Sequence, residues 1–559
     1  AVPITLAIAL FLSELYGFTL NRVTLFALIF AIGILVDDAI VVVENVHRWF
    51  ELKLAKIPRE AVVRATDEVG NPTILATFTV IAALMPMAFV TGLMGPYMRP
   101  IPINASVAMF FSLLVAFVIT PWASYRLLKY DEKEKHEEIN VKETLFWKVY
   151  SKVMVQLIVS KPKRYVFYSL TLLLLFLSVG LLITRAVVVK MLPYDNKSEL
   201  QIVLDMPEGT SLEKTLEAAK AIGDYISRQS IVKNYQIYTG TSSPFNFNGL
   251  VRHYYLRQGT NLADIQVNLI GKHNRKEQSH DFAKLIRPKV HEIAKAYGAK
   301  YVAVVEVPPG PPVLSPIVAE IYGPDLKIQE GFAKEVLRVF KDSSSITDAG
   351  IYLEEPSPLV RLIPKEDKLK LARLDREELV YTLQALIGGY QAGILQTTTT
   401  EQVPIVIRFD EKYRTLDILK TLKVPTKDGK LVPLSELVEV KEETAPITIY
   451  HKNLRRVVYV IGDVSGREEA PFYGIMDVRK RVLDLPNPYG KVKELWMSLP
   501  LIEDGMYVKW DGEMHITLEV FRDLGLAFAV ALFVMYVLIL GWFKDFRVPG
   551  IIMAPIPLT

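Results

Sequence analysis

Residues 23–45, VTLFALIFAIGILVDDAIVVVEN, are apolar almost throughout, yet they contain Asp37 and Asp38 side by side. From Val23 to Val43 a helix would be roughly 31 Å long at about 1.5 Å per residue, close to the thickness of a bilayer's hydrocarbon core. An ionised carboxylate at that depth costs roughly 2.5 to 3.5 kcal/mol. A cationic partner, protonation or a wet pathway would offset this cost, and the last two together describe a proton relay. We therefore predict a membrane helix in which Asp37 and Asp38 relay protons. The alternative is a buried ion pair that fixes helix packing.

The composition indicates that membrane and aqueous parts are combined in one chain. Of the 559 residues, 51% are hydrophobic, which is high for a soluble protein, whereas the charged share of 23% is ordinary. This length predicts two to four domains. The net charge of +4, from 65 basic and 61 acidic residues, is too small to indicate a nucleic-acid partner. The chain has no cysteine, which excludes disulfides and thiolate sites.

Apolar runs and basic segments predict the membrane topology. The chain begins inside an apolar run, residues 2–18, without an initiator methionine, so we expect a fragment. Basic residues in 47–65 and 126–164 place those segments on the cytoplasmic side, with LFWKVYSKVMVQLIV at 145–159 along the interface. The region between the spans expected at residues 165–188 and 523–543 is then extracytoplasmic. Spans are expected at residues 23–43, 73–90, 101–122, 165–188 and 523–543.

The long polar region alternates strand and helix patterns. Residues 199–307 follow the order β-α-β-β-α-β, which is the split, ferredoxin-like unit. A second unit begins with PIVAEIYG at 316–323, and we expect its next strand to be PLVRLIPK at 358–365. An insertion then interrupts this unit, and the unit resumes with VVYVIGDV at 457–464. The prediction is α/β modules rather than a long loop.

Several motifs resemble one known family. GILVDDAIVVVEN closely resembles the fourth transmembrane helix of resistance-nodulation-division (RND) efflux pumps. LPYDNKSELQIVLDMPEGTSLEKT resembles the entry into their periplasmic porter region, and FDEKYRTL followed by DGKLVPLSEL resembles their docking domain. The resemblance implies a membrane α-helical bundle with a periplasmic α+β region of ferredoxin-like porter subdomains and an inserted docking domain. The chain would run from the third transmembrane helix to the start of the ninth.

The resemblance also implies domain boundaries, which follow the family's order of parts. They are residues 1–129 for the third to sixth transmembrane helices, 130–163 for a cytoplasmic amphipathic helix, 164–190 for the seventh transmembrane helix, 191–314 for porter subdomain 1, 315–373 with 456–513 for porter subdomain 2, 374–455 for the docking domain, and 514–559 for the eighth and the start of the ninth transmembrane helix.

The resemblance implies a function and partners. It indicates the inner-membrane permease of a proton antiporter of the hydrophobe/amphiphile, multidrug type, which is a homotrimer in the bacterial inner membrane. The pump would export amphiphilic or hydrophobic compounds with a periplasmic adaptor protein and an outer-membrane channel. Asp37 and Asp38 would take up and release protons, while their family partner, a lysine on a later helix, is not in this chain. The loop GTSSPFNFNGLVRHYY resembles the family's switch loop, so Phe245 and Phe247 would contact substrate; packing of these rings into a core is the alternative.

Other chemistry fits less well. Heavy-metal export by the same type of pump is the main alternative, because thioethers suit Cu(I) and five methionines lie in or near the porter region: Met191, Met206, Met497, Met506 and Met514. Such methionines more often fill cores, and metal-exporting relatives tend to carry a single aspartate in this motif. Adjacent aspartates on one helix point about 100° apart, unlike a protease dyad, so we expect no enzyme. We expect no metal site, cofactor or nucleotide site, and an ion gradient as the energy source.

Overall fold

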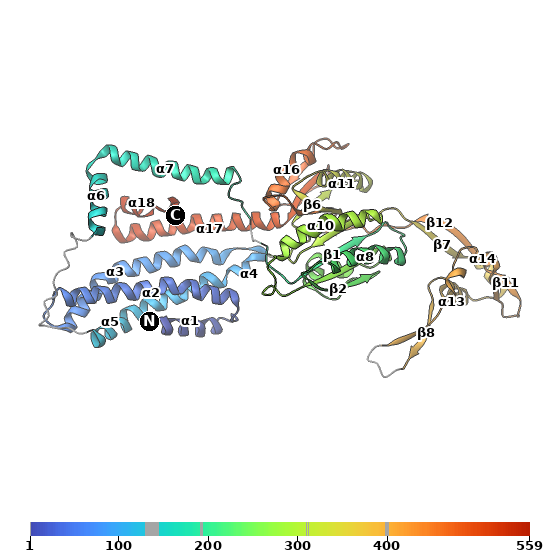
Figure 1. The fold of residues 1–559 in the computed structure, drawn as a ribbon, viewed down its shortest axis with the longest axis horizontal. Coiled ribbons are helices and arrows are strands. Elements are labelled where there is room, and N and C mark those ends of the chain that lie inside the picture. Colours follow the sequence, from blue (N-terminus) through green and yellow to red (C-terminus); the bar gives the residue numbers. More distant parts are fainter. Residues whose placement is uncertain are drawn as a thin grey trace.

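The computed structural model describes residues 2–128, 145–190, 194–308, 310, 312–396 and 402–558. A bundle of long helices forms one end of the molecule, two α/β subdomains follow it, and an arm of short strands and helices projects beyond them (Figure 1). In the described residues, five helices are long and apolar enough to cross a membrane: Val23–Glu51, Pro58–Phe89, Gly95–Leu127, Lys161–Ile183 and Glu513–Phe543. The predicted division into apolar helices and an α/β region is therefore present.

The centre of the bundle is the acidic helix α2 (Arg22–Glu51), packed between two neighbours. Asn21 begins α2 with a capping box, in which its side chain accepts from the backbone N–H of Thr24 and the Thr24 hydroxyl oxygen accepts from the backbone N–H of Asn21. The small residues Ala31 and Ala105 are fully buried, which lets α2 approach α5 closely. The other elements of this part are α1 (Val2–Leu15), α3 (Pro58–Leu84), η1 (Met85–Phe89), η2 (Gly92–Met94), α4 (Gly95–Met98) and α5 (Pro100–Leu127).

A second group of helices lies along the bundle. The predicted amphipathic segment is helical as α6 (Leu145–Val159). Residues 130–144 of that predicted domain lie outside the described residues. Helix α7 (Lys161–Ile183) has no buried residue in this chain. The C-terminal elements are α17 (Glu513–Phe543), α18 (Arg547–Met553) and η6 (Ile556–Leu558), so α17 begins ten residues before the predicted span at residue 523.

The first α/β subdomain has the predicted element order. Its antiparallel sheet has the strand order β2-β3-β1-β4, and α8 and α10 cover one face with a core that includes Ile222, Ile265 and Ile286. The loop after β2 contains the short helices α9 (Phe247–Arg252) and η4 (Tyr254–Leu256). The main elements are β1 (Glu199–Asp205), α8 (Leu212–Ser227), β2 (Val232–Thr239), β3 (Leu262–Leu269), α10 (Ser279–Ala296) and β4 (Tyr301–Val305).

The second subdomain has a five-stranded sheet in the order β16-β17-β5-β15-β6. The prediction that residues 358–365 supply its second strand is wrong, because β6 (Ile346–Ile351) takes that place beside β15. The predicted segment is β7 (Pro358–Pro364), which pairs with β12 (Val438–Thr444) in the projecting arm. The other elements are β5 (Ile317–Tyr322), α11 (Leu326–Lys341), β15 (Val458–Val464), α16 (Pro471–Leu483), β16 (Lys493–Leu495) and β17 (Tyr507–Gly512).

The projecting arm has its own small core, in which Leu379, Leu386 and Leu434 are buried. Strands β7 and β12 connect this core to the second subdomain, and the β8–β9 hairpin extends away from it (Figure 1). Its elements are α12 (Glu366–Ala372), α13 (Arg376–Ile387), β8 (Tyr390–Leu395), β9 (Val403–Ile407), η5 (Glu411–Tyr413), α14 (Ile418–Thr421), β10 (Lys423–Pro425), β11 (Leu431–Pro433) and α15 (Leu434–Leu437), followed by the hairpin β13 (His451–Lys452) and β14 (Arg455–Arg456).

Helix α17 joins the second subdomain directly to the bundle. Strand β17 ends at Gly512, and α17 starts at the next residue and runs along α3 (Figure 1). At the near end of the bundle, Asp523 accepts hydrogen bonds from the Thr91 backbone N–H at 2.9 Å and the Thr91 hydroxyl at 2.5 Å. One continuous helix therefore connects the sheet of the second subdomain to α3.

Gly512 is the residue whose replacement should loosen this junction. Its φ is +78°, and an added Cβ would lie 2.4 Å from the carbonyl oxygen of Ser315. Gly512→Ala should therefore destabilise the protein by more than about 1 kcal/mol and lower its Tm. Thermal unfolding of the purified full-length protein measures this loss. Gly525→Ala is the matched control on α17, since the added Cβ would meet nothing within 4 Å beyond its chain neighbours and the helix's own nearby backbone. An equal Tm for the two variants would contradict the account of the junction.

Candidate functional site

The two predicted acids lie on different sides of α2. Asp38 is partly buried and faces α3, where the Thr77 hydroxyl lies 3.3 Å from its Oδ1 and 3.5 Å from its Oδ2. The same hydroxyl is 2.9 Å from the carbonyl oxygen of Thr73. Asp37 is exposed in this chain, as the 100° step between adjacent helical residues requires. The structure therefore separates the pair into an inner and an outer carboxylate.

The inner carboxylate lies in a mostly apolar layer of the bundle. Leu35 and Val42, close to Asp38 along the same side of α2, are essentially inaccessible to solvent. The Ser112 hydroxyl donates to the Leu35 carbonyl oxygen at 2.8 Å, which connects α5 to α2 just before the acids. Within the part of the chain that the structure describes, neither Asp37 nor Asp38 forms an ion pair. The hydroxyl of Thr77 is thus the polar contact that the structure records for Asp38.

The far end of α2 is attached to α3 by a polar cluster. Glu68 accepts hydrogen bonds from Arg48 at 2.7 Å and from the Trp49 indole N–H at 2.7 Å. The Asn45 amide donates to the Ala65 carbonyl oxygen at 2.7 Å and to Glu68 at 3.1 Å. These contacts hold the two helices together about two to three turns beyond Asp38.

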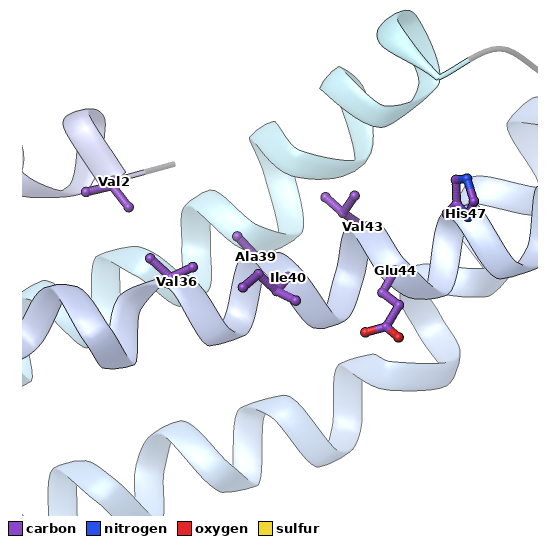
Figure 2. Close-up of a pocket in the computed structure, with 7 residues that line it drawn as sticks. All are labelled: Val2, Val36, Ala39, Ile40, Val43, Glu44 and His47. Atoms are coloured by element: carbon purple, nitrogen blue, oxygen red, sulfur yellow. The ribbon is translucent and has the colours of Figure 1, made fainter. Parts of the chain in front are cut away.

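A groove of about 590 Å³ runs along the outer side of α2 beside the start of α1. Figure 2 shows Glu44 and His47 at one end of this groove and Val36 and Ala39 near the other. The sequence interpretation did not single out Glu44 or His47. Glu44 and His47 follow Ile40 at i+4 and i+7, and residues with this spacing share one side of a helix. This spacing was the available sequence signal that the three residues line one groove.

A larger cavity of about 950 Å³ lies between the two α/β subdomains. The first subdomain contributes Tyr254 and Tyr301 to its wall, and the second contributes Tyr352 and Tyr450. Charged side chains of both signs complete the lining: Asp205, Glu208, Arg252, Arg257, Lys300, Lys334, Lys341, Glu354 and Glu355. Aromatic faces beside fixed charges are suited to molecules that have both apolar and polar groups.

The two predicted substrate residues lie outside the lining of this cavity. Phe245 is 80% exposed and stacks on Tyr255 with ring centroids 5.9 Å apart, and Phe247 begins α9 and is 45% exposed. The cavity is instead lined by later residues of the same loop, including Arg252 and Tyr254. The loop that the motif indicated thus reaches the cavity through Arg252 and Tyr254, which the sequence interpretation did not single out.

The loop is held in place by ion pairs at the wall of the cavity. The Arg257 guanidinium lies 2.5 Å from Asp205 and 3.1 Å from Asp264, which is 1% exposed. Burial raises the pKa of Asp264, and the positive charge of Arg257 acts against that shift. Arg252 extends across the junction and lies 3.7 Å from Asp463 of the second subdomain.

The described methionines named above are mainly core residues. Met206 is buried in the first subdomain, and Met506 and Met514 are buried in the second. Met497 is 37% exposed, and Met191 lies outside the described residues. The structure therefore gives three of these thioethers a packing role.

A bundle of membrane-length helices containing a partly buried carboxylate, joined by a continuous helix to α/β subdomains that enclose a cavity, defines a membrane transporter class. The sequence of this chain matches the AcrB/AcrD/AcrF family over residues 1–559, and the chain belongs to that family. The resemblance to RND permeases is thereby confirmed at the level of the family.

Two individual similarities agree with this assignment. The chain is 23% identical over 570 residues to an uncharacterized transporter of Haemophilus influenzae, a match that covers 100% of this chain and 50% of the relative. It also resembles the crystal structure of a heavy metal efflux pump with a TM-score of 0.74 and 19% identity, over 100% of this chain and 52% of that one. The chain thus spans about half the length of these relatives, and the second similarity supports the fold alone.

Arg257 supplies a direct test of how the cavity loop is held. Arg257→Ala should destabilise the protein by about 3 to 5 kcal/mol, because it leaves the buried Asp264 without its counter-charge. Denaturant unfolding of the full-length protein, followed by the fluorescence of a label in the first subdomain, measures the change. Arg228→Ala is the control, since Arg228 is exposed at the end of α8. A loss in Arg257→Ala no larger than in this control would rule out the proposed support.

Proposed function

We propose that this chain is the central part of a proton-driven exporter in the bacterial inner membrane, with its α/β region in the periplasm. The cargo is amphiphilic or hydrophobic and is collected in the cavity between the two subdomains. In this proposal the subdomains are ferredoxin-like porter units and the projecting arm is a docking domain. Asp37 and Asp38 form the proton relay.

The observation that carries this proposal is the position of Asp38. Its carboxylate lies within an apolar helix layer beside a hydroxyl that has two acceptors in reach, Asp38 and the Thr73 carbonyl oxygen. An ionised carboxylate there favours a donated hydrogen bond, whereas a protonated one becomes a donor itself. Protonation therefore changes both the charge and the direction of hydrogen bonding between α2 and α3. A small shift of these helices follows from such a change.

The continuous helix α17 provides a route from this shift to the cavity. It contacts α3 in the bundle and begins at the end of β17 in the second subdomain. Arg252 and Asp463 lie 3.7 Å apart across the subdomain junction, so displacement of the second subdomain changes contacts at the cavity wall. In the proposed cycle, proton binding at Asp38 alternates the cavity between open and closed forms.

Membership of the family supports the proposed assembly. RND pumps work with a periplasmic adaptor and an outer-membrane channel, and we extend this arrangement, with a homotrimeric permease, to the full-length protein. The projecting arm is suited to such contacts, because Val403, Ile405 and Ile407 of its β9 strand are exposed apolar residues.

Heavy-metal cation efflux by the same type of pump is the alternative cargo. The similarity to a solved heavy metal efflux pump favours it, but at 19% identity that similarity concerns the fold. Burial of Met206, Met506 and Met514 in cores favours the organic cargo, since a thioether must reach the cavity to bind a metal.

The proton relay is tested in the full-length protein. Asp37→Asn and Asp38→Asn should each abolish dye export from cells, because the amide keeps the size of the side chain but does not titrate. Export rates are measured at equal membrane expression and equal oligomeric state. Wild-type export by either variant would refute the relay.

Thr77 offers a matched pair that separates hydrogen bonding from packing. Thr77→Val should slow export roughly 2- to 13-fold, the range that corresponds to a hydrogen bond of about 0.5 to 1.5 kcal/mol. Thr77→Ser retains the hydroxyl and should export close to the wild-type rate. Equal rates in the two variants would mean that the contact with Asp38 has no part in the cycle.

The cargo assignment of the loop is tested with the double variant Phe245→Ala and Phe247→Ala. Loss of two exposed aromatic rings should alter the resistance profile of an expressing strain toward dyes, detergents and antibiotics, while copper, silver, zinc and cobalt tolerance stays the same. An unchanged profile for every compound would refute the role of the rings. A change confined to the metal salts would favour the alternative cargo.

A further inference from the structure

One side of α10 carries a stripe of basic residues that the export proposal does not use. His280, Lys284, Arg287 and His291 follow one another at i, i+4, i+7 and i+11, which places them on the same side of the helix. All four contact acidic residues of the second subdomain, although α10 belongs to the first. The stripe therefore joins the two subdomains.

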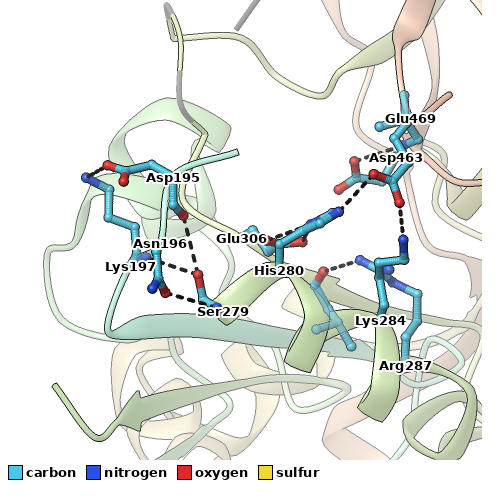
Figure 3. Close-up of polar contacts among 12 residues, drawn as sticks. Asp195, Asn196, Lys197, Ser279, His280, Lys284, Arg287, Glu306, Asp463 and Glu469 are labelled. Carbon is cyan, nitrogen blue, oxygen red and sulfur yellow. Dashed lines mark hydrogen bonds and ion pairs between the residues drawn. The ribbon is translucent and has the colours of Figure 1, made fainter. Parts of the chain in front are cut away.

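His280 is the residue at the start of this stripe. Its Nδ1 lies 2.9 Å from Glu306 of its own subdomain, and its Nε2 lies 3.1 Å from Glu469 of the other. Figure 3 shows the imidazole between these two carboxylates. The Tyr194 ring stacks on it, with centroids 4.0 Å apart and planes 12° from parallel. The side chains of His280, Glu306 and Glu469 are each at most 16% exposed.

The start of α10 is firmly positioned, which keeps His280 in place. Asn196 accepts a hydrogen bond from the Ser279 backbone N–H at 3.1 Å, and the Lys197 backbone N–H donates to the Ser279 hydroxyl at 3.0 Å. The Ser279 hydroxyl lies 3.3 Å from the Asp195 carbonyl oxygen (Figure 3). The imidazole therefore faces the second subdomain from a fixed base.

At the other end of the stripe, Arg287 and His291 bind Asp348 of β6. The His291 Nε2 lies 2.7 Å from Asp348 Oδ1, and the Arg287 Nε lies 3.1 Å from Asp348 Oδ2. The Val304 backbone N–H in β4 donates to Oδ2 at 3.0 Å. Burial acts to raise the pKa of Asp348, but the hydrogen bond from His291 and the charge of Arg287 outweigh it and lower the pKa. Asp348 is thus an ionised anchor.

The two carboxylates around His280 favour its protonated form. Each ring nitrogen faces a carboxylate, so the imidazolium, which has two N–H donors, satisfies both contacts. A neutral ring has one donor and turns a lone pair toward the other carboxylate. Burial acts to lower the pKa of His280, but the hydrogen bonds and charges of Glu306 and Glu469 outweigh it and raise the pKa.

Of the two carboxylates that contact His280, Glu306 depends more on the positive charge of the imidazolium than Glu469 does. Glu469 also pairs with Lys284 and, at 3.5 Å, with Lys190, so it keeps counter-charges when His280 is neutral. Glu306 has the His280 hydrogen bond, and Arg287 and Asp463 act on it through space with opposite signs. Burial raises the pKa of Glu306. Loss of the His280 proton therefore leaves a buried carboxylate poorly compensated.

We propose that the α10 stripe is a proton-sensitive joint between the subdomains, in which His280 is the positioning residue that holds the cavity closed when it is protonated. The joint lies where edge strands β4 and β6 meet, and Tyr301 of β4 and Gly350 of β6 also line the cavity. Its consequence for cargo rests on the proposed export function, whereas the joint itself does not. External pH then controls access to the cavity independently of Asp38.

The direction of the pH effect follows from the raised pKa of His280. The closed form binds the proton more tightly than an open form in which His280 faces water. The joint is therefore fully stabilised below about pH 6.5, the ordinary histidine value, and loses this stabilisation as the pH rises through the higher pKa of the closed form.

A distance measurement tests the joint directly. These 559 residues contain no cysteine, so spin labels at Lys214→Cys on α8 and Lys327→Cys on α11 report the separation of the subdomains in the full-length protein, with any cysteine outside these residues replaced. From about pH 5.5 to 8.5, a short-distance population should give way to a longer one. Loss of one proton changes the ratio of the two by up to about tenfold per pH unit. His280→Gln should show the longer population at every pH.

Two further variants make the result decisive. His273→Gln replaces an exposed histidine of the same subdomain and should titrate like the wild type. Glu469→Gln removes one of the two negative charges that face the imidazolium of His280. This variant should move the midpoint of the distance change to lower pH. A distance distribution that does not change with pH, or a His280→Gln variant that titrates like the wild type, would overturn the joint. Export by Asp38→Asn would instead refute the relay alone, because the labels report closure without transport.

Discussion

The arrangement of the bundle depends on one constraint, the presence of the Asp38 carboxylate inside an apolar helix layer. Its recorded polar contact is the Thr77 hydroxyl of α3, at 3.3 Å. Small buried residues such as Ala31 let α5 come close to α2, and the Glu68 cluster connects α2 to α3 farther along. A site built in this way responds to a proton through charge and hydrogen bonding together, which is why we assign it the energy input of the proposed exporter.

Two structural links extend from this constraint to the cavity. Helix α17 is continuous from β17 to the bundle, where Asp523 binds the Thr91 backbone and hydroxyl. Gly92 follows with φ +65°, and the Glu519 carboxylate lies where a side chain at Gly92 would be. The α10 stripe provides the second link, between the subdomains themselves. In the combined account, the membrane carboxylates move the second subdomain, and His280 determines how easily the subdomains separate.

Sequence reasoning predicted the parts of this structure that follow from local patterns. Apolar runs located the membrane-length helices, and the alternation of strands and helices located the first subdomain. It failed where long-range pairing decides: residues 358–364 have a good strand pattern, yet β6 occupies the sheet and β7 pairs with β12. The loop motif drew attention to Phe245, whereas Arg252 and Tyr254 reach the cavity, because lining depends on how the two subdomains meet. The contacts of Glu306 and Glu469 with His280 could likewise not be predicted, because these two residues are far apart in the sequence.

In the proposed exporter, protons drive export through the membrane carboxylates Asp37 and Asp38. Full-length protein reconstituted in vesicles with an imposed pH gradient and a fluorescent amphiphilic cargo allows proton flux and cargo flux to be recorded together. Adding cargo should accelerate dissipation of the gradient, and a protonophore should stop cargo movement. Cargo movement that continues at the same rate after the gradient has been collapsed would contradict proton-driven export.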